Sequence, residues 1–267
     1  MKKLHLSLKN EINSIKEFDE QQYQEIEEII NHFIINSKMK WAYEVIRRNF
    51  NILIGSADNE FKQLSNGDLL WEKLELASLE INRNILNYLA SSNTFLDQTK
   101  KFLSKKFGKN SEEDKKFTKM TNDLFDDHFS YRFLYKLRNF TVHCGFSLCA
   151  ISVEYDHKQI TFIPKFIYDD LMEDTSFWGP IVRGDLEKMG KDFKAFNLFH
   201  ESILHFKQLS DFVSANFIDD EEQAFVNRFY ELTGIDKANI DEYCFLVKED
   251  DLIKIAQIPT HYLRILA

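Results

Sequence analysis

The sequence predicts a mainly α-helical protein with a small β hairpin or sheet near its middle. Only 8 Gly and 3 Pro occur in 267 residues, which favours long helices over a turn-rich β architecture. Apolar residues recur at helical spacing along most of the chain, whereas two stretches after residue 145 are rich in β-branched and aromatic residues. The 25 Phe residues are expected to fill the cores between the helices.

The first half of the chain is expected to form a series of helices. The apolar pattern predicts one helix from Glu17 to about Ser37 and a second from Lys38 to a break at Gly55-Ser56. A longer amphipathic helix is expected after Asn66-Gly67-Asp68, where apolar residues recur at intervals of three and four: Leu70, Leu74, Ala77, Ile81, Ile85 and Leu89. Ser111, followed by two glutamates, is expected to cap another helix. A helix over about residues 121–144 follows and is called the motif helix below.

The pattern changes after Gly145. The segments FSLCAISVEY and KQITFIP predict a β hairpin over about residues 146–163. Residues 165–180 are expected to be irregular, and helical spacing resumes from about Asp185 to Phe217. An acidic start at residues 219–222 predicts a helix that ends at Gly234, and the tail reads as strand-like or mixed. We therefore expect a helical domain over residues 1–217 and a C-terminal extension over residues 218–267.

The strongest chemical signal is Arg138-Asn139 followed by His143, close to the end of the motif helix. An imidazole can move a proton near neutral pH, and a guanidinium can stabilise charge that develops on a phosphate. Together these groups suffice to cleave RNA without a metal ion. The pattern of Arg, Asn and a following His occurs once in the chain, since Arg48-Asn49 and Arg83-Asn84 have no histidine behind them.

An ideal helix places the polar residues of this segment on one stripe, namely Arg132, Lys136, Asn139 and His143. The apolar residues Phe133, Leu137, Phe140 and Cys144 fall on the opposite side. Asn139 is then placed to orient the His143 imidazole through a bond from i to i+4. Arg138, however, lies about 140° around the helix from His143. Either the helix distorts before Gly145, or two chains each supply part of one cleft.

The segment LRNFTVHCGFSL resembles the signature of the HEPN superfamily (higher-eukaryote and prokaryote nucleotide-binding domains). The segment from Leu79 to Leu103 is similar to the preceding helix of its defence-associated members, and the likeness covers about residues 65–155. The resemblance implies a HEPN-like helical bundle with Arg138, Asn139 and His143 as the catalytic set. It also implies a homodimeric, metal-independent endoribonuclease that leaves 2′,3′-cyclic phosphate ends.

The resemblance further implies a role in bacterial toxin–antitoxin or anti-phage defence, with a protein antitoxin or regulator as a candidate partner. Members that a partner nucleotidyltransferase modifies carry Tyr two places after the histidine, where this chain has Gly145. Neutralisation by tyrosine adenylylation is therefore not expected. The alternative reading is a non-catalytic HEPN-like module that binds RNA, a nucleotide or a protein. A purely structural role, with Asn139 and His143 as buried polar contacts, is also open.

The formal net charge of −9 means that only a local patch can attract RNA. Residues 100–119 hold eight lysines against three acidic residues. This run is either part of an RNA-binding surface or a solvated corner between helices. The candidate RNA-binding residues are Arg132, Lys136, Lys105 and Lys106.

Other chemistries find little support in the sequence. The three cysteines form no Cys-x-x-Cys pair, and the histidines of the string from His200 to His205 are one residue too far apart for a zinc protease. No Gly-rich phosphate loop occurs. We expect no metal and no cofactor. Apolar stretches are shorter than the roughly 20 residues that span a bilayer, so we expect a cytoplasmic protein without membrane contact.

Overall fold

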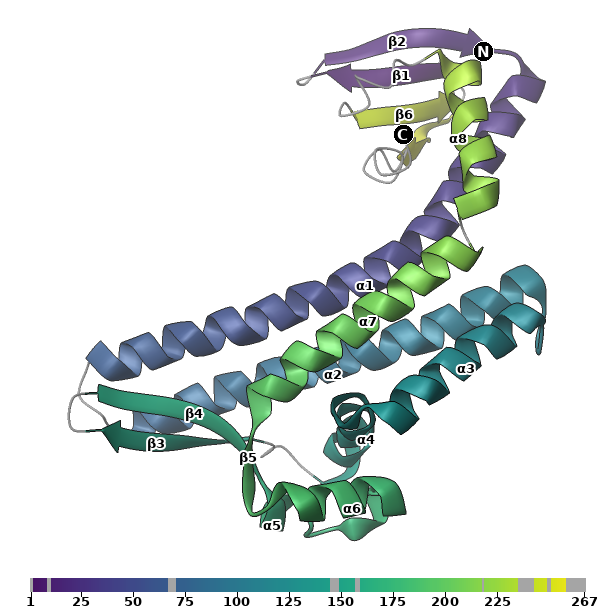
Figure 1. Ribbon diagram of the computed structural model, residues 1–267. Coiled ribbons are helices and arrows are strands. Elements are labelled where there is room, and N and C mark those ends of the chain that lie inside the picture. The colour runs from purple at the N-terminus through teal and green to yellow at the C-terminus, as the bar shows by residue number, and fades with distance from the viewer. Residues whose placement is uncertain are drawn as a thin grey trace. The chain divides into compact units, whose positions relative to one another are not determined.

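The structure is a computed structural model, which describes residues 2–8, 11–66, 71–144, 149–156, 159–217, 219–234, 243–248 and 251–257. These residues are mainly helical, with a small antiparallel sheet after the motif helix, as the sequence predicts (Figure 1). The chain divides into two units. The terminal unit comprises Met1–Trp41 and Phe212–Ala267, and the central unit comprises Ala42–Asp211.

This division differs from the predicted boundary at residue 218, because the N-terminal residues belong with the C-terminal ones. The terminal unit contains a four-stranded antiparallel sheet in the order β2-β1-β6-β7. Its strands are β1 (Lys2–Leu8), β2 (Glu11–Phe18), β6 (Tyr243–Lys248) and β7 (Asp251–Gln257). The strand-like reading of the tail is confirmed for β6 and β7. Strands β1 and β2 were not predicted, although apolar residues alternate with polar ones from Lys3 to Leu8.

The described core of the terminal unit lies between the start of α1 (Glu20–Asn66) and α8 (Asp219–Thr233), which run side by side in Figure 1. A stripe of apolar residues on α1 is buried from Tyr23 to Phe33 and packs on apolar residues of α8: Val226, Phe229, Tyr230 and Leu232. Helix α8 ends as predicted. The Gly234 amide donates to the Tyr230 carbonyl, and Gly234 has a φ of 69°, a value that favours glycine.

The expected break at Gly55 does not occur, since α1 is one helix from Glu20 to Asn66. A glycine inside a helix costs only about 1 kcal/mol relative to alanine. The neighbouring side chains of Leu53 and Ala57 are completely buried. The burial of these two side chains outweighs the low helix propensity of Gly55.

In the central unit, α2 (Trp71–Phe107), α3 (Glu112–Asp127) and α4 (Phe129–Cys144) pack against one another (Figure 1). The predicted stripe of α2 is buried at Ala77, Ile81, Ile85 and Leu89 and partly buried at Leu74, while Leu70 lies outside the described residues. The predicted cap of α3 is confirmed. The Ser111 hydroxyl accepts a hydrogen bond of 3.2 Å from the Asp114 amide.

The motif helix is shorter than expected, because it begins at Phe129 and not near residue 121. Helix α3 ends at Asp127, and His128 between the two helices has extended backbone angles of φ −122° and ψ 114°. No glycine or proline marks this break. It is stabilised from α4, where the Arg132 guanidinium donates to the carbonyl oxygens of Phe125 and Asp126 in the last turn of α3.

The predicted hairpin is present as β3 (Ala150–Asp156) and β4 (Gln159–Ile167), and β5 (Asp192–Lys194) adds a third antiparallel strand. Residues 165–180, expected to be irregular, contain the end of β4, α5 (Tyr168–Leu171) and the 3₁₀ turn η1 (Thr175–Phe177). Pro180 starts α6 (Pro180–Met189), five residues before the predicted helix, because proline suits the first helical turn. Gly190 follows α6, and α7 (Ala195–Phe217) completes the expected helical region.

Candidate active site

The apolar side of α4 anchors the motif. Phe133, Leu137 and Phe140 are buried, as the helical wheel predicts. The rings of Phe133 and Phe140 stack on Trp178, with centroids 5.7 and 5.1 Å apart. The Trp178 indole nitrogen in turn donates to the Leu171 carbonyl at 2.6 Å. This fixed packing determines which way the remaining side chains of α4 point.

Arg138 lies on the side of α4 that faces α2 and α7. It lines a small hollow of about 20 Å³ together with Leu89, Ser92 and Phe206. Its Nη1 donates to Asn139 Oδ1 at 3.1 Å, and it forms no ion pair with any carboxylate in the described part of the chain. The side chain is half-buried. A guanidinium without a carboxylate partner retains its charge for an anionic ligand.

Asn139 does not have the predicted contact. Its side-chain oxygen accepts from Arg138, and no bond joins it to the His143 ring among the residues that the structure describes. The neighbouring guanidinium carries a full charge, and hydrogen bonds to charged groups are stronger than those between neutral groups. Asn139 therefore orients Arg138, where the sequence suggested that it orients His143.

His143 lies in the last turn of α4 with an exposed side chain. Its ring stacks on Phe177 of η1, with centroids 5.1 Å apart and planes at 15°. One face of the imidazole is thus covered by Phe177. His143 is accessible and Asn139 is only half-buried, so the purely structural alternative, in which both residues are buried polar contacts, is not supported.

The side chains of Arg138 and His143 point towards different elements of the same chain. The former points towards α2 and α7, and the latter towards η1. Helix α4 stays α-helical to Cys144, so the distortion considered before Gly145 does not occur within its described length. The side chain of Cys144 and residues 145–148 lie outside the described residues. The separation of about 140° expected from the helical wheel is therefore retained.

Arg132 is not available to RNA, in contrast to its prediction as a binding residue. Its side chain is only 11% exposed and forms an ion pair of 2.6 Å with Asp185 of α6. Its Nη1 contacts the last-turn carbonyls of α3 at 3.2 and 3.0 Å. The guanidinium thus connects α3, α4 and α6. Arg132 stabilises the packing of these helices.

The predicted lysines have different surroundings. Lys136 is half-buried and lines a groove between α2, α3 and α4. Lys105 is exposed at the end of α2, whereas the Lys106 ammonium lies 5.9 and 5.4 Å from the Phe102 and Phe107 ring centroids. Two other lysines of residues 100–119 are paired with acids, Lys115 with Glu112 and Lys119 with Asp123. The basic run is therefore partly neutralised.

His128 and His205 form a pair that the sequence does not indicate, because the two residues are far apart in the chain. The rings of His128 and His205 lie 4.2 Å apart, and Ser130 Oγ is 3.3 Å from His205 Nε2. Burial lowers the pKa of His205, the charge of a protonated His128 lowers it further, and Glu201 opposes both. In the parts of the chain described above, no group of three or more His, Cys, Asp or Glu is arranged to hold a metal ion.

Two further observations bear on function. None of the described helices combines the length and the apolar character that crossing a bilayer requires. Comparison of the chain with models of known protein families, with curated proteins and with solved structures gives no match.

Proposed function

We propose that the protein is a metal-independent endoribonuclease of the HEPN type that acts as a homodimer. One observation carries the proposal. Arg138, with no carboxylate partner among the described residues, is oriented by Asn139 on the same helix end that presents an exposed histidine, His143. A charged guanidinium and a solvent-accessible imidazole are the two groups that phosphate transfer to a ribose hydroxyl requires.

The geometry of α4 supports the proposed dimer. Because Arg138 and His143 face different elements of one chain, a site that contains both groups would combine the guanidinium of one protomer with the imidazole of its partner. A two-fold axis near the end of α4 would pair the Arg138 of each copy with the His143 of the other, which gives two equivalent clefts. Each cleft would then contain residues from both copies.

In the proposed reaction, a His143 imidazole accepts the proton of the ribose 2′-OH. The 2′-oxygen forms a bond to phosphorus, and the bond from phosphorus to the 5′-oxygen breaks. The departing 5′-oxygen receives a proton from water, and the imidazolium then releases its proton to water, while Arg138 stabilises the charge on the phosphorane. The products are a 2′,3′-cyclic phosphate and a 5′-hydroxyl end.

We place this activity in the bacterial cytoplasm, in toxin–antitoxin or anti-phage defence, with an antitoxin or regulatory protein as a partner. An unrestrained ribonuclease would arrest growth. Expression of the wild-type chain alone should therefore stop growth, and expression of His143→Ala should not.

The direct test is to incubate RNA with purified wild-type protein, Arg138→Ala and His143→Ala. Each substitution should lower the cleavage rate by about 10²- to 10⁴-fold, whereas chelation with EDTA should have no effect. His200→Ala is the matched control, since His200 is another exposed histidine of the central unit. Wild-type protein that binds RNA without cutting it would instead identify a non-catalytic RNA-binding module.

Mixing the two inactive variants tests the shared cleft. A heterodimer of Arg138→Ala with His143→Ala contains one cleft in which arginine and histidine are both intact. Mixing equal amounts should restore about a quarter of the wild-type activity, since half of the dimers are mixed and each has one complete cleft. An active wild type with no recovery on mixing would show that each chain supplies a whole site.

A further inference from the structure

The helices of the central unit enclose a groove that the proposed catalytic groups do not occupy. It has a volume of about 300 Å³, at the lower end of the range for small-ligand sites. Helices α2, α3 and α4 each contribute to it through residues that include Asn93, Lys100, Asn122, Phe125, Tyr135 and Lys136. Asn93 and Tyr135 also line the hollow beside Arg138, so the groove continues towards that guanidinium.

The groove carries local positive charge in a chain whose net charge is −9. Lys100 of α2 and Lys136 of α4 line it, and neither forms an ion pair within the described ranges. One carboxylate, Asp97, is also present, and its Oδ2 accepts a hydrogen bond of 2.9 Å from the Asn93 amide. Two lysines against one aspartate leave an excess of one positive charge, which favours a phosphate backbone.

The groove also presents an aromatic surface. The Tyr135 side chain is 43% exposed, and its ring meets that of Phe125 edge-on, with centroids 6.1 Å apart and planes at 89°. This contact restrains the ring and leaves part of it open to solvent. Exposed aromatic rings beside lysines are the surfaces on which single-stranded bases stack. Asn122 is exposed nearby and can donate to and accept from a base edge.

We infer that this groove binds single-stranded RNA and holds the nucleotides next to the scissile phosphate, an inference that rests on the proposed ribonuclease function. The lysines bind phosphates, and Tyr135 stacks on a base. A single strand is required because the bases of a duplex are stacked on one another and cannot lie against a tyrosine. The continuity with the hollow at Arg138 leads the strand to the catalytic guanidinium.

Binding can be measured by fluorescence anisotropy with a labelled single-stranded RNA of mixed sequence and about 12 nucleotides, a length that can cover such a site. His143→Ala protein is used as the background so that the probe stays intact. Tyr135→Ala should weaken binding by about 5- to 100-fold, and Tyr135→Phe should retain it. Lys100→Ala and Lys136→Ala should each reduce the slope of log affinity against log salt by about 0.7 to 1.

Lys119→Ala is the matched control, because Lys119 lies on α3 and its ammonium is already paired with Asp123 at 2.6 Å. It removes the same charge without changing the groove. Groove variants that bind the probe as tightly as this control would overturn the inference. A duplex of the same sequence should bind more weakly than the single strand, and equal or tighter binding would also overturn it.

The inference and the proposed function can fail separately. Protein that binds RNA through the groove and never cuts it would disprove the ribonuclease and leave the groove as a binding site. Protein that cuts RNA at an unchanged rate and KM when Tyr135 and both lysines are replaced would disprove the groove alone. Thermal unfolding of each variant shows whether a loss of binding reflects a loss of fold.

Discussion

Two arginines of α4 were both predicted to contact RNA, and they have different surroundings in the structure. Arg132, in the first turn, has its guanidinium neutralised by Asp185 and bonded to two carbonyls of α3. The Arg138 guanidinium, less than two turns later, donates to Asn139, has no carboxylate partner among the described residues and lines a hollow. The difference shows that residues from distant segments determine whether a charge on a helix is structural or available to a ligand.

Replacing the structural arginine should have the largest effect on stability. Arg132→Ala would leave the Asp185 carboxylate, which is 18% exposed, without its partner and would release the end of α3. We expect the free energy of unfolding to fall by about 3 kcal/mol. Arg138→Ala and His143→Ala should each change it by less than about 1 kcal/mol, because their side chains are more exposed.

Chemical denaturation of the three variants measures this contrast. Equal losses for Arg132→Ala and Arg138→Ala would mean that the two arginines do not differ as described. Asp185→Asn provides an independent check, because it removes the charge of the partner and keeps its size.

A smaller, pH-dependent effect is expected at the start of α4, where His205 contacts Ser130 and Tyr131. The pKa of His205 is lowered in the folded state by burial and by His128, so the unfolded chain binds this proton more readily. The stabilising contribution of neutral His205 is complete above the ordinary value of 6.5 and is lost as pH falls through the lower folded pKa.

The measurement is the thermal unfolding temperature between neutral and mildly acidic pH. His205→Gln should flatten the decline below pH 6.5, whereas His143→Ala, at the exposed end of α4, should leave it unchanged. An identical decline in His205→Gln would assign the pH dependence to other groups.

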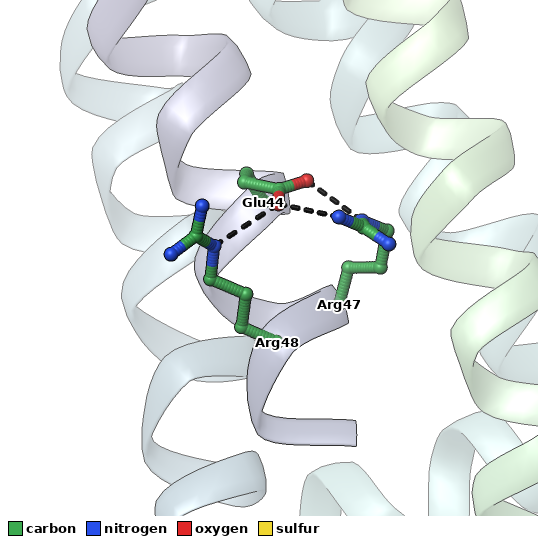
Figure 2. A network of polar contacts seen from close by, with 3 residues as sticks. All are labelled: Glu44, Arg47 and Arg48. Carbon is green, nitrogen blue, oxygen red and sulfur yellow. Dashed lines mark hydrogen bonds and ion pairs between the residues drawn. The ribbon is translucent and has the colours of Figure 1, made fainter. Parts of the chain in front are cut away.

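The smallest effect on stability is expected for an exposed ion cluster around Glu44, which can be compared with the buried pair of Arg132 and Asp185. Figure 2 shows Glu44 of α1 between Arg47 and Arg48, with contacts of 2.6 and 3.1 Å. Hydrogen bonding from Arg47, supported by Arg48, lowers the pKa of Glu44 to about 2. Its contribution is therefore present above the ordinary value of 4.5 and is lost as pH falls towards 2.

Glu44→Gln should lower the free energy of unfolding by about 0.5 kcal/mol at neutral pH and low salt, and by less at high salt. The side chains of Glu44, Arg47 and Arg48 are 34%, 49% and 74% exposed, so water screens their attraction. Denaturation of this variant beside Arg132→Ala compares the two clusters directly. A loss as large as that of Arg132→Ala would show that burial does not separate them.

Local features of the fold could be predicted where the signal is contained in a few neighbouring residues. The cap at Ser111, the stripe of α2 and the end of α8 at Gly234 all follow from short-range chemistry. The break at His128 could not be predicted, because it depends on Arg132 and on packing beyond α3. Strand β1 carries only a short alternating pattern, and its partner β6 lies far away in the sequence.

The site was predictable to the same extent. The helical wheel placed Arg138 and His143 on different sides of α4, as the structure has them. It could not show that Asn139 contacts Arg138, since both i to i+1 and i to i+4 partners were available. The sequence does not single out Tyr135, because a tyrosine in a helix is most often a core residue, and its exposure depends on α2 and α3.

The pairing of β1 with β6 has a consequence for biosynthesis. The sheet of the terminal unit joins residues 2–8 to residues 243–248, so it cannot form before the ribosome has translated residues 243–248. The central unit, residues 42–211, has all of its sequence earlier and can fold first. Nascent β1 and β2 would meanwhile expose an unpaired strand edge, a period in which a chaperone would have most to protect.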